Sequence, residues 1–161
     1  MKTAFRGVAL AAALAVGGPV VFATAAQAAT EQPVRNPHLA QTVCGFQHSV
    51  VDSDPILRPS DGAEVARVYL LRAQRTGATC VTTIKSAFFG TLTRTVAALG
   101  NTNAPVQLHD AQELVYAGPV RESAPQGTCV FWGGHLVDPV TGEWYHHAGA
   151  NPAIGWNATC F

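Results

Sequence analysis

The hydrophobic positions follow two different patterns along the chain. Residues 8–22 form one almost continuous apolar run, whereas from about residue 43 the apolar residues occur in short runs separated by glycine and proline. The later runs are rich in valine, threonine and aromatic residues, and no window keeps the period of an amphipathic helix. This part of the chain is therefore predicted to be all-β, a single small β-sandwich or barrel-like domain built from hairpins.

The clearest hairpin is predicted to join residues 64–73 to residues 78–87. Its first strand is apolar on both faces apart from Arg67, so we expect it to lie centrally in a sheet. In the second strand Ile84 and Lys85 lie on opposite faces, and the face that carries Lys85 is expected to be the wetter one.

A strand at 91–98 and a turn cluster at 101–105 follow this hairpin. A second hairpin is then predicted from residues 113–120, a turn at 125–127 and a strand at 128–134. In both hairpins Thr-Cys-Val stands just after a glycine-containing turn. A weak internal duplication and two unrelated hairpins both remain open as explanations.

The amino-terminal apolar run has the features of a secretory signal peptide. Lys2 and Arg6 supply positive charge before it, and Ala26-Gln27-Ala28 supplies small residues for a cleavage site. The run is shorter than the ~20 residues of a membrane-spanning helix, so we expect export without membrane insertion. The predicted organisation is a signal peptide (1–28), a flexible leader (29–42) and a disulfide-bonded β domain (43–161).

The charge of the exported part is close to balanced. The whole chain has ten basic and ten acidic side chains, and removal of Lys2 and Arg6 leaves a small acidic excess. A nucleic-acid-binding protein usually carries a strong basic excess or a basic stripe, and this sequence has neither. A nucleic-acid partner is therefore not expected.

All four cysteines lie in the exported part. An even number of cysteines in an oxidising compartment predicts two disulfides, and no two cysteines stand close enough for a Cys-x-x-Cys metal site. Four cysteines allow three pairings, and the sequence alone does not decide among them. The sequential pairing is favoured because its two loops are of similar length: Cys44 with Cys80, and Cys129 with Cys160.

The strongest candidate for metal or acid–base chemistry is the segment from Glu143 to His147, with His135 before it. In an extended segment His146 and His147 point to opposite faces, so they cannot share one ion. Glu143 and His147 share a face, and His135 could join them from the preceding strand. The spacing differs from the helical His-Glu-x-x-His pattern of metalloproteases, so a polar surface strand without metal or cofactor is the preferred interpretation.

Nucleophilic catalysis lacks its usual sequence signatures. The chain has no Gly-x-Ser-x-Gly elbow, and each cysteine is better explained as half of a disulfide. Asp52 and Asp54 could share a face as paired carboxylates, but Asp52-Ser53-Asp54-Pro55 is predicted to be a turn. No catalytic residue is predicted.

Five aromatic residues in the last third of the chain are candidates for surface contact. β-Domains that bind carbohydrates or other polymers use aromatic side chains beside glycine turns for stacking. The preferred interpretation of the tryptophans is that they cover the disulfides and the core. The five candidates are Tyr116, Trp132, Trp144, Tyr145 and Trp156.

One stretch of the sequence resembles a known family. Tyr116-Ala117-Gly118-Pro119-Val120, Gly127-Thr128-Cys129-Val130 and Trp132-Gly133-Gly134 are similar to the spore-associated protein A family, small secreted proteins of filamentous, spore-forming bacteria. Cys44-Gly45 and Val68-Tyr69-Leu70 agree upstream, so the resemblance covers nearly the whole domain. It implies an exported protein at the spore or aerial-cell surface, and it brings no catalytic residue with it.

The combined expectation is a non-catalytic secreted protein that associates with the spore or cell surface, with a surface polymer as its partner. One alternative is a secreted protease inhibitor, for which Glu122 to Gln126, before Cys129, is the candidate loop. The other alternative is a small metal-assisted hydrolase that uses His135, Glu143 and His147.

Overall fold

The structure is a computed structural model that describes residues 37–147, 149 and 155–161. The predicted signal peptide and residues 29–36 of the predicted leader lie outside the described residues. Within the described part the chain forms one helix and nine strands. They are α1 (Pro37–Cys44), β1 (Ser49–Leu57), β2 (Glu64–Arg72), β3 (Ala78–Lys85), β4 (Thr93–Asn101), β5 (Ala104–Glu113), β6 (Tyr116–Ser123), β7 (Cys129–Val137), β8 (Trp144–His146) and β9 (Asn157–Cys160).

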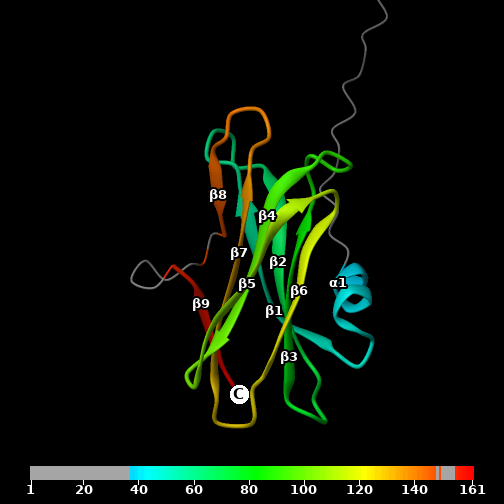
Figure 1. Cartoon of the computed structure of the whole chain (residues 1–161), viewed down its shortest axis with the longest axis vertical. Coiled ribbons are helices and arrows are strands. Elements are labelled where there is room, and N and C mark those ends of the chain that lie inside the picture. Colours follow the sequence, from blue (N-terminus) through cyan, green and yellow to red (C-terminus); the bar gives the residue numbers. More distant parts are fainter. Residues whose placement is uncertain (1–36, 148, 150–154) are drawn as a thin grey trace, which may run out of the picture. The chain divides into compact units, whose positions relative to one another are not determined.

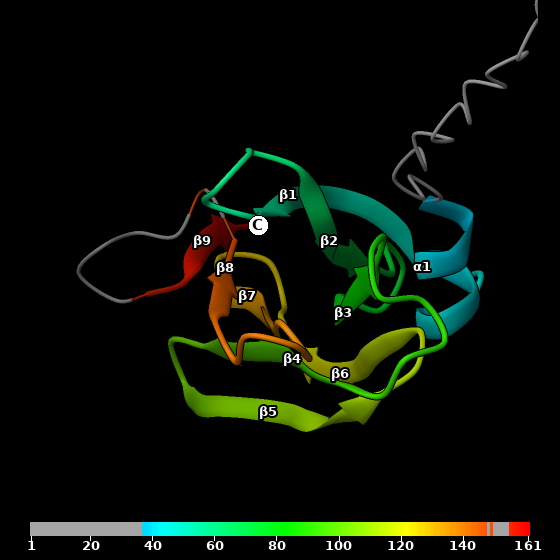
Figure 2. The ribbon, with the colours of Figure 1, turned by 90° about the horizontal axis from the view of Figure 1, so that it is seen from above.

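The strands form two antiparallel sheets (Figure 1). The first has the order β1-β2-β3-β6, and the second has the order β5-β4-β7-β8, with β9 also pairing with β7. Figure 2 shows the two sheets facing each other across a common interior. β8 pairs with residues 135–137 of β7 and β9 with residues 129–132, so they follow one another along the same edge. The predicted all-β sandwich is confirmed.

The main core lies between the two sheets. The first sheet contributes Val68, Leu70 and Val81, and all three side chains are excluded from solvent. The second sheet contributes Leu99 and Trp132, which are also buried. Alternate positions of each strand therefore face one shared interior, as the two-residue period of a strand requires.

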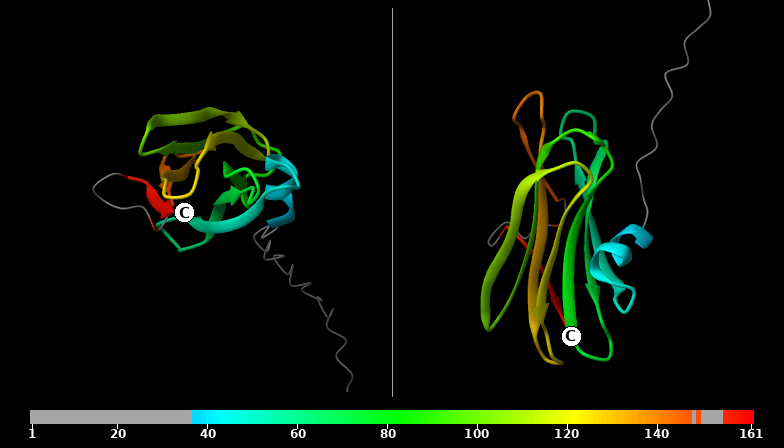
Figure 3. Two further views of the ribbon diagram at one scale, coloured as in Figure 1. Left: turned by 90° about the horizontal axis from the view of Figure 1, so that it is seen from below. Right: turned by 45° about the vertical axis from the view of Figure 1, so that its right-hand side comes forward.

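A second apolar cluster lies on the outer face of the first sheet, under α1. Tyr69 and Leu71 of β2 alternate with the core-facing residues and pack against Ala40 of the helix. Figure 3 shows α1 beside this sheet. β2 is covered on both faces and lies between β1 and β3, so both its predicted central position and the first hairpin are confirmed.

Both disulfides follow the sequential pairing, which is thereby confirmed. Cys44 at the end of α1 bonds to Cys80 in β3, and Cys129 in β7 bonds to Cys160 in β9. The bonded residues are 36 and 31 positions apart. Closing loops of this size in the unfolded chain stabilises the folded state by about 4 kcal/mol for each bond. The first bond holds the helix on its sheet, and the second holds the last strand against β7.

The helix differs from the sequence prediction of a flexible leader up to residue 42 and a domain that begins at Val43. α1 begins at Pro37 and packs on β2 and β3. An eight-residue segment is too short to form a stable helix by itself, so its packing on the sheet and the Cys44 disulfide stabilise it. In the described part of the chain no helix is long and apolar enough to cross a membrane.

The predicted second hairpin is wrong in its pairing. Strands do form on both sides of the predicted turn, but β6 pairs with β3 of the first sheet and β7 pairs with β4 of the second. The connection from Ser123 to Cys129 therefore carries the chain from one sheet to the other. The local pattern of a strand does not specify its partner, and here each strand pairs with a non-neighbour in sequence.

The predicted wetter face at Lys85 is also wrong, because this side chain has no solvent exposure. Its ammonium group donates to the main-chain carbonyls of Thr91 at 2.7 Å and Glu113 at 3.1 Å. Burial lowers the pKa of Lys85 to about 8, although the charge of Glu113 acts in the opposite direction. The segment that follows β3 and the end of β5 thus cover a position that the strand pattern of β3 predicted to be solvent-facing.

Candidate functional site

The structure separates the five aromatic residues that the sequence grouped as surface contacts. Trp132 and Tyr145 are buried, with relative exposures of 1% and 2%. The Trp132 indole N–H donates to the Thr159 hydroxyl at 2.9 Å, and the Tyr145 hydroxyl donates to the Asp138 carboxylate at 2.8 Å. Buried rings whose polar ends are hydrogen-bonded belong to the core. The prediction of surface contact is therefore wrong for these two residues.

The other three candidates are at least partly accessible. Tyr116 is half-buried and packs against the cluster under α1, on the first sheet. Trp144 is exposed and Trp156 is half-buried, and both lie near His135 on the second sheet. The ring centroids of these two tryptophans are 6.3 and 5.2 Å from that of His135.

Four rings form a cluster on the second sheet, which we call the histidine–tryptophan cluster: His135, His146, Trp144 and Trp156. Its position follows from the strand register, because directly paired residues of neighbouring strands project to the same side of a sheet. One row of register partners crosses four strands in the order β5, β4, β7, β8, and it consists of Asp110, Val96, His135 and His146.

An ion pair borders this cluster. The guanidinium of Arg94 lies over the ring of Trp144, 4.7 Å from its centroid, and donates to both carboxylate oxygens of Asp110 at 2.8 and 2.7 Å. The hydrogen bond from Arg94 keeps the pKa of Asp110 below its ordinary value. The two parallel hydrogen bonds between Arg94 and Asp110 order the guanidinium group, and this group makes a cation–π contact with one face of Trp144.

The two histidines of the cluster touch through their ring nitrogens. Nδ1 of His135 lies 2.7 Å from Nδ1 of His146, and the ring centroids are 4.6 Å apart. One nitrogen must donate and the other accept, so the contact requires at least one neutral ring. Burial, helped by the positive charges that His146 and His147 would carry, lowers the pKa of His135 to about 4. His135 is therefore neutral at neutral pH.

Asp54, which the sequence named together with Asp52 as a possible pair of carboxylates, is the buried carboxylate of this region. The predicted turn at residues 52–55 is wrong: the segment belongs to β1, and Asp54 is buried in the strand. Its Oδ2 accepts hydrogen bonds from His147 Nδ1 at 3.0 Å, the Asn157 side-chain amide at 3.0 Å and the Gly149 main-chain N–H at 2.5 Å. One carboxylate thus connects β1 to the ends of β8 and β9, about a hundred residues away. The alternation of Asp52 and Asp54 had indicated two carboxylates on one face of a strand, but the turn-like sequence Asp-Ser-Asp-Pro was given more weight.

A polar hollow of about 420 Å³ opens beside this carboxylate. Asp52 of β1 is exposed within the hollow, and its Oδ1 accepts a hydrogen bond from the main-chain N–H of Ser53 at 2.8 Å. The hollow therefore presents two carboxylates, an amide and main-chain groups to solvent. Its lining residues are Asp52, Ser53, Asp54, Gly149, Asn157 and Ala158.

His147 is enclosed between aromatic rings. Its ring is nearly parallel to those of Trp132 and Trp156, with centroid distances of 6.5 and 6.4 Å. Its Nε2 atom is buried without a hydrogen-bond partner among the described residues. A Cβ atom on Gly133 would collide with this nitrogen, so the glycine is required for the close approach. The Nδ1 atom of His147 is hydrogen-bonded to Asp54, and its Nε2 atom is buried.

The structure does not bring His135, Glu143 and His147 together as a metal site. His135 contacts His146 instead, the ring centroids of His135 and His147 are 6.1 Å apart, and Glu143 is exposed. Among the described residues, no three His, Cys, Asp or Glu side chains converge on a common point. His146 and His147 do face different surroundings, as the strand geometry predicts.

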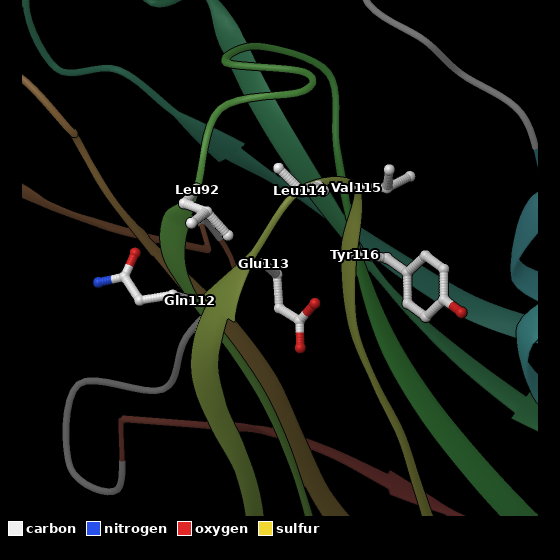
Figure 4. Close-up of a pocket in the computed structure, with 6 residues that line it drawn as sticks. All are labelled: Leu92, Gln112, Glu113, Leu114, Val115 and Tyr116. Carbon is white, nitrogen blue, oxygen red and sulfur yellow. The ribbon is translucent and has the colours of Figure 1, made fainter.

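A second hollow, of about 310 Å³, lies where the chain passes from β5 to β6 (Figure 4). The end of β5, the connection between β5 and β6, and Tyr116 line it, together with Leu92 from the segment before β4. The Lys85 main-chain N–H donates to the Val115 carbonyl in this connection. The ammonium group of Lys85 donates to the main-chain carbonyls of Thr91 and Glu113, so the side chain links β3 to the segment before β4 and to the end of β5.

The segment predicted as an inhibitory loop, Glu122 to Gln126, is tied down at its centre. Ala124 is buried, its main-chain N–H donates to the Gly77 carbonyl at 3.0 Å, and its carbonyl accepts from the Arg72 guanidinium at 3.0 Å. A protease inhibitor presents an extended and exposed segment to the enzyme. The geometry around Ala124 does not favour that role.

No protein-family model, no curated protein and no solved structure matches this chain. The function is therefore argued from the geometry of the site. The features available are an exposed aromatic surface bordered by an ion pair, two converging histidine nitrogens, and a carboxylate-lined hollow.

Proposed function

We propose that the mature protein is a non-catalytic secreted protein that associates with the spore or cell exterior by binding a carbohydrate-rich surface polymer. The histidine–tryptophan cluster is the contact surface in this proposal. The observation that carries it is that the rings of Trp144 and Trp156 both lie next to His135, at centroid distances of 6.3 and 5.2 Å, with Trp144 exposed. The location at a spore or cell surface comes from the resemblance to the spore-associated protein A family.

Two physical features suit such a contact. An exposed tryptophan offers a flat apolar face for stacking on the apolar face of a sugar ring, and it loses little conformational entropy on binding. Arg94 already holds Trp144, so the ring is ordered before a ligand arrives. The carboxylate of Asp110 and the nitrogens of His146 supply polar groups beside the aromatic rings, as polymer hydroxyl groups require.

The surroundings of His147 support binding rather than catalysis. Asp54 and His147 have the hydrogen bond of an acid–base pair, at 3.0 Å. The nitrogen that would exchange a proton with a substrate is buried beneath Trp156 and against Gly133. A substrate cannot reach it, so the pair acts as a structural connection.

The two disulfides are compatible with an extracellular location, because such bonds persist in oxidising compartments. The predicted signal peptide at residues 1–28 leads to the same compartment. Secretion and surface association therefore form part of one proposal.

The test is a partition experiment with the purified mature protein on washed spores, vegetative cell walls and isolated cell-wall polysaccharide. Trp144→Ala combined with Trp156→Ala is expected to lower the bound fraction at least tenfold, because truncating a central tryptophan typically costs about 2 kcal/mol of binding free energy. The matched control is the double variant Phe46→Ala and Phe89→Ala, which removes two rings exposed by 82% and 46%. Unchanged binding of a folded tryptophan double variant would refute this contact surface.

A further inference from the structure

Two imidazole nitrogens converge on the second sheet. His135 of β7 and His146 of β8 are direct register partners, so their side chains leave the sheet on the same side. Their Nδ1 atoms lie 2.7 Å apart. We propose that these two residues form a binding site for a divalent transition-metal ion, with Cu(II) as the preferred ion.

The distance between the two nitrogens is close to what a shared ion requires. Two imidazole ligands at about 2.1 Å from a metal, and at a right angle to one another, place their nitrogens about 3 Å apart. The pair therefore needs to open by only a few tenths of an ångström. His146 is exposed and can rotate to make this adjustment, while the half-buried His135 supplies a fixed ligand.

The type and number of ligands favour Cu(II). Imidazole nitrogen binds Cu(II), Ni(II) and Zn(II), and affinity at a given site rises toward Cu(II) along the divalent series. Square-planar Cu(II) accepts two neighbouring nitrogens at a right angle, whereas a structural Zn(II) site uses four converging ligands. Because no third such side chain converges here in the described part of the chain, the remaining positions would hold water or an external ligand.

The local charge does not oppose a cation. The basic side chain of Arg94 contacts Trp144 of the cluster, and its charge is balanced by the two-pronged ion pair with Asp110. Asp110 lies in the same row of register partners and adds an attractive negative charge.

His147 does not belong to this site. Its Nδ1 is held by Asp54, and its Nε2 faces Gly133 inside the molecule. The proposed metal site shares His135 and His146 with the proposed polymer surface, but metal binding can be measured without a polymer.

The experiment is a titration of the metal-free mature protein with Cu(II), followed by tryptophan fluorescence. A bound Cu(II) ion would lie close to Trp144 and Trp156, whose rings are near His135, so saturable quenching is expected. His146→Ala should raise the apparent Kd at least tenfold. This variant is decisive because the exposed position leaves the core unchanged, and His135→Ala should give the same loss.

His109→Ala and His38→Ala are the matched controls, because each removes one histidine outside the pair. Both variants should retain the affinity of the unmodified protein. Electron paramagnetic resonance of the Cu(II) complex should show two coordinated imidazole nitrogens, reduced to one in His146→Ala. An equal Kd for His146→Ala and the unmodified protein, or the absence of saturable binding, would overturn the proposal.

Discussion

Replacing Asp54 with alanine is expected to destabilise the domain by about 3–4 kcal/mol. A hydrogen bond to a charged group contributes about 1.5–3 kcal/mol, and Asp54 accepts three. Gly149 and Asn157 border the hollow, so water can replace the carboxylate there, and the loss at each falls to about 0.5–1 kcal/mol. The Nδ1 atom of His147 is buried and would lose its partner, at a cost of about 1–3 kcal/mol.

The assay is urea unfolding of the disulfide-intact mature protein at pH 7, followed by tryptophan fluorescence. A domain of this size has a denaturant dependence of about 1.5 kcal/mol per molar urea, so the midpoint should fall by about 2 M. Asp54→Asn keeps one neutral acceptor oxygen, and we expect it to lose about half as much stability.

Asp52→Ala is the matched control on the same strand. Asp52 is exposed and makes only a local hydrogen bond to Ser53 and a long one, of 3.4 Å, to Thr159. We expect it to change the unfolding free energy by less than about 1 kcal/mol. Equal midpoint shifts for Asp54→Ala and Asp52→Ala would refute the view that Asp54 holds β1 to the ends of β8 and β9.

Two further predictions concern other positions of the domain. Gly133→Ala should lower the unfolding free energy by about 2–3 kcal/mol, because its Cβ would collide with His147 and Trp156. The combination with His147→Ala should cost less than the sum of the two single variants, and strict additivity in urea unfolding would contradict the proposed collision. Lys85 loses its proton near pH 8 in the folded protein and near pH 10.5 in the unfolded chain, so between these values the unfolded chain binds more protons. The unfolding free energy contributed by Lys85 should therefore rise from pH 8 to 10, and Lys85→Met should lack this rise. Equal pH dependences of the unfolding free energy in the two proteins would contradict the lowered pKa of Lys85.

Much of the fold is readable in the sequence because it depends on local signals. The first hairpin has a strand that is apolar on both faces, a short turn and a second strand with period two, and residues 66–72 and 79–85 pair as expected. Similar loop lengths favoured the sequential disulfide pairing, and the structure shows why it forms at one of the two bonds: Cys129 and Cys160 are direct register partners on neighbouring strands. β5 was not predicted, because most of its side chains are exposed and its hydrophobic pattern is weak.

The candidate site was predicted only in part. Trp144 and Trp156 were among the aromatic candidates, and both lie in the cluster. Asp54 was assigned to a turn because Asp-Ser-Asp-Pro is a typical turn sequence. β1 is an edge strand. Pro55 is tolerated there because its missing N–H removes no hydrogen bond between central strands of the sheet.

The sequence by itself determined the all-β class, the central position of β2 and the favoured pairing of the cysteines. These properties rest on residues that are close in the chain or on loop lengths. The tertiary structure alone decided that β6 and β7 belong to different sheets, that Lys85 is covered, and that Asp54 meets His147. The physical reason is that each of these depends on contacts between segments far apart in sequence, whose partners are selected by burial of the whole domain and leave no local pattern.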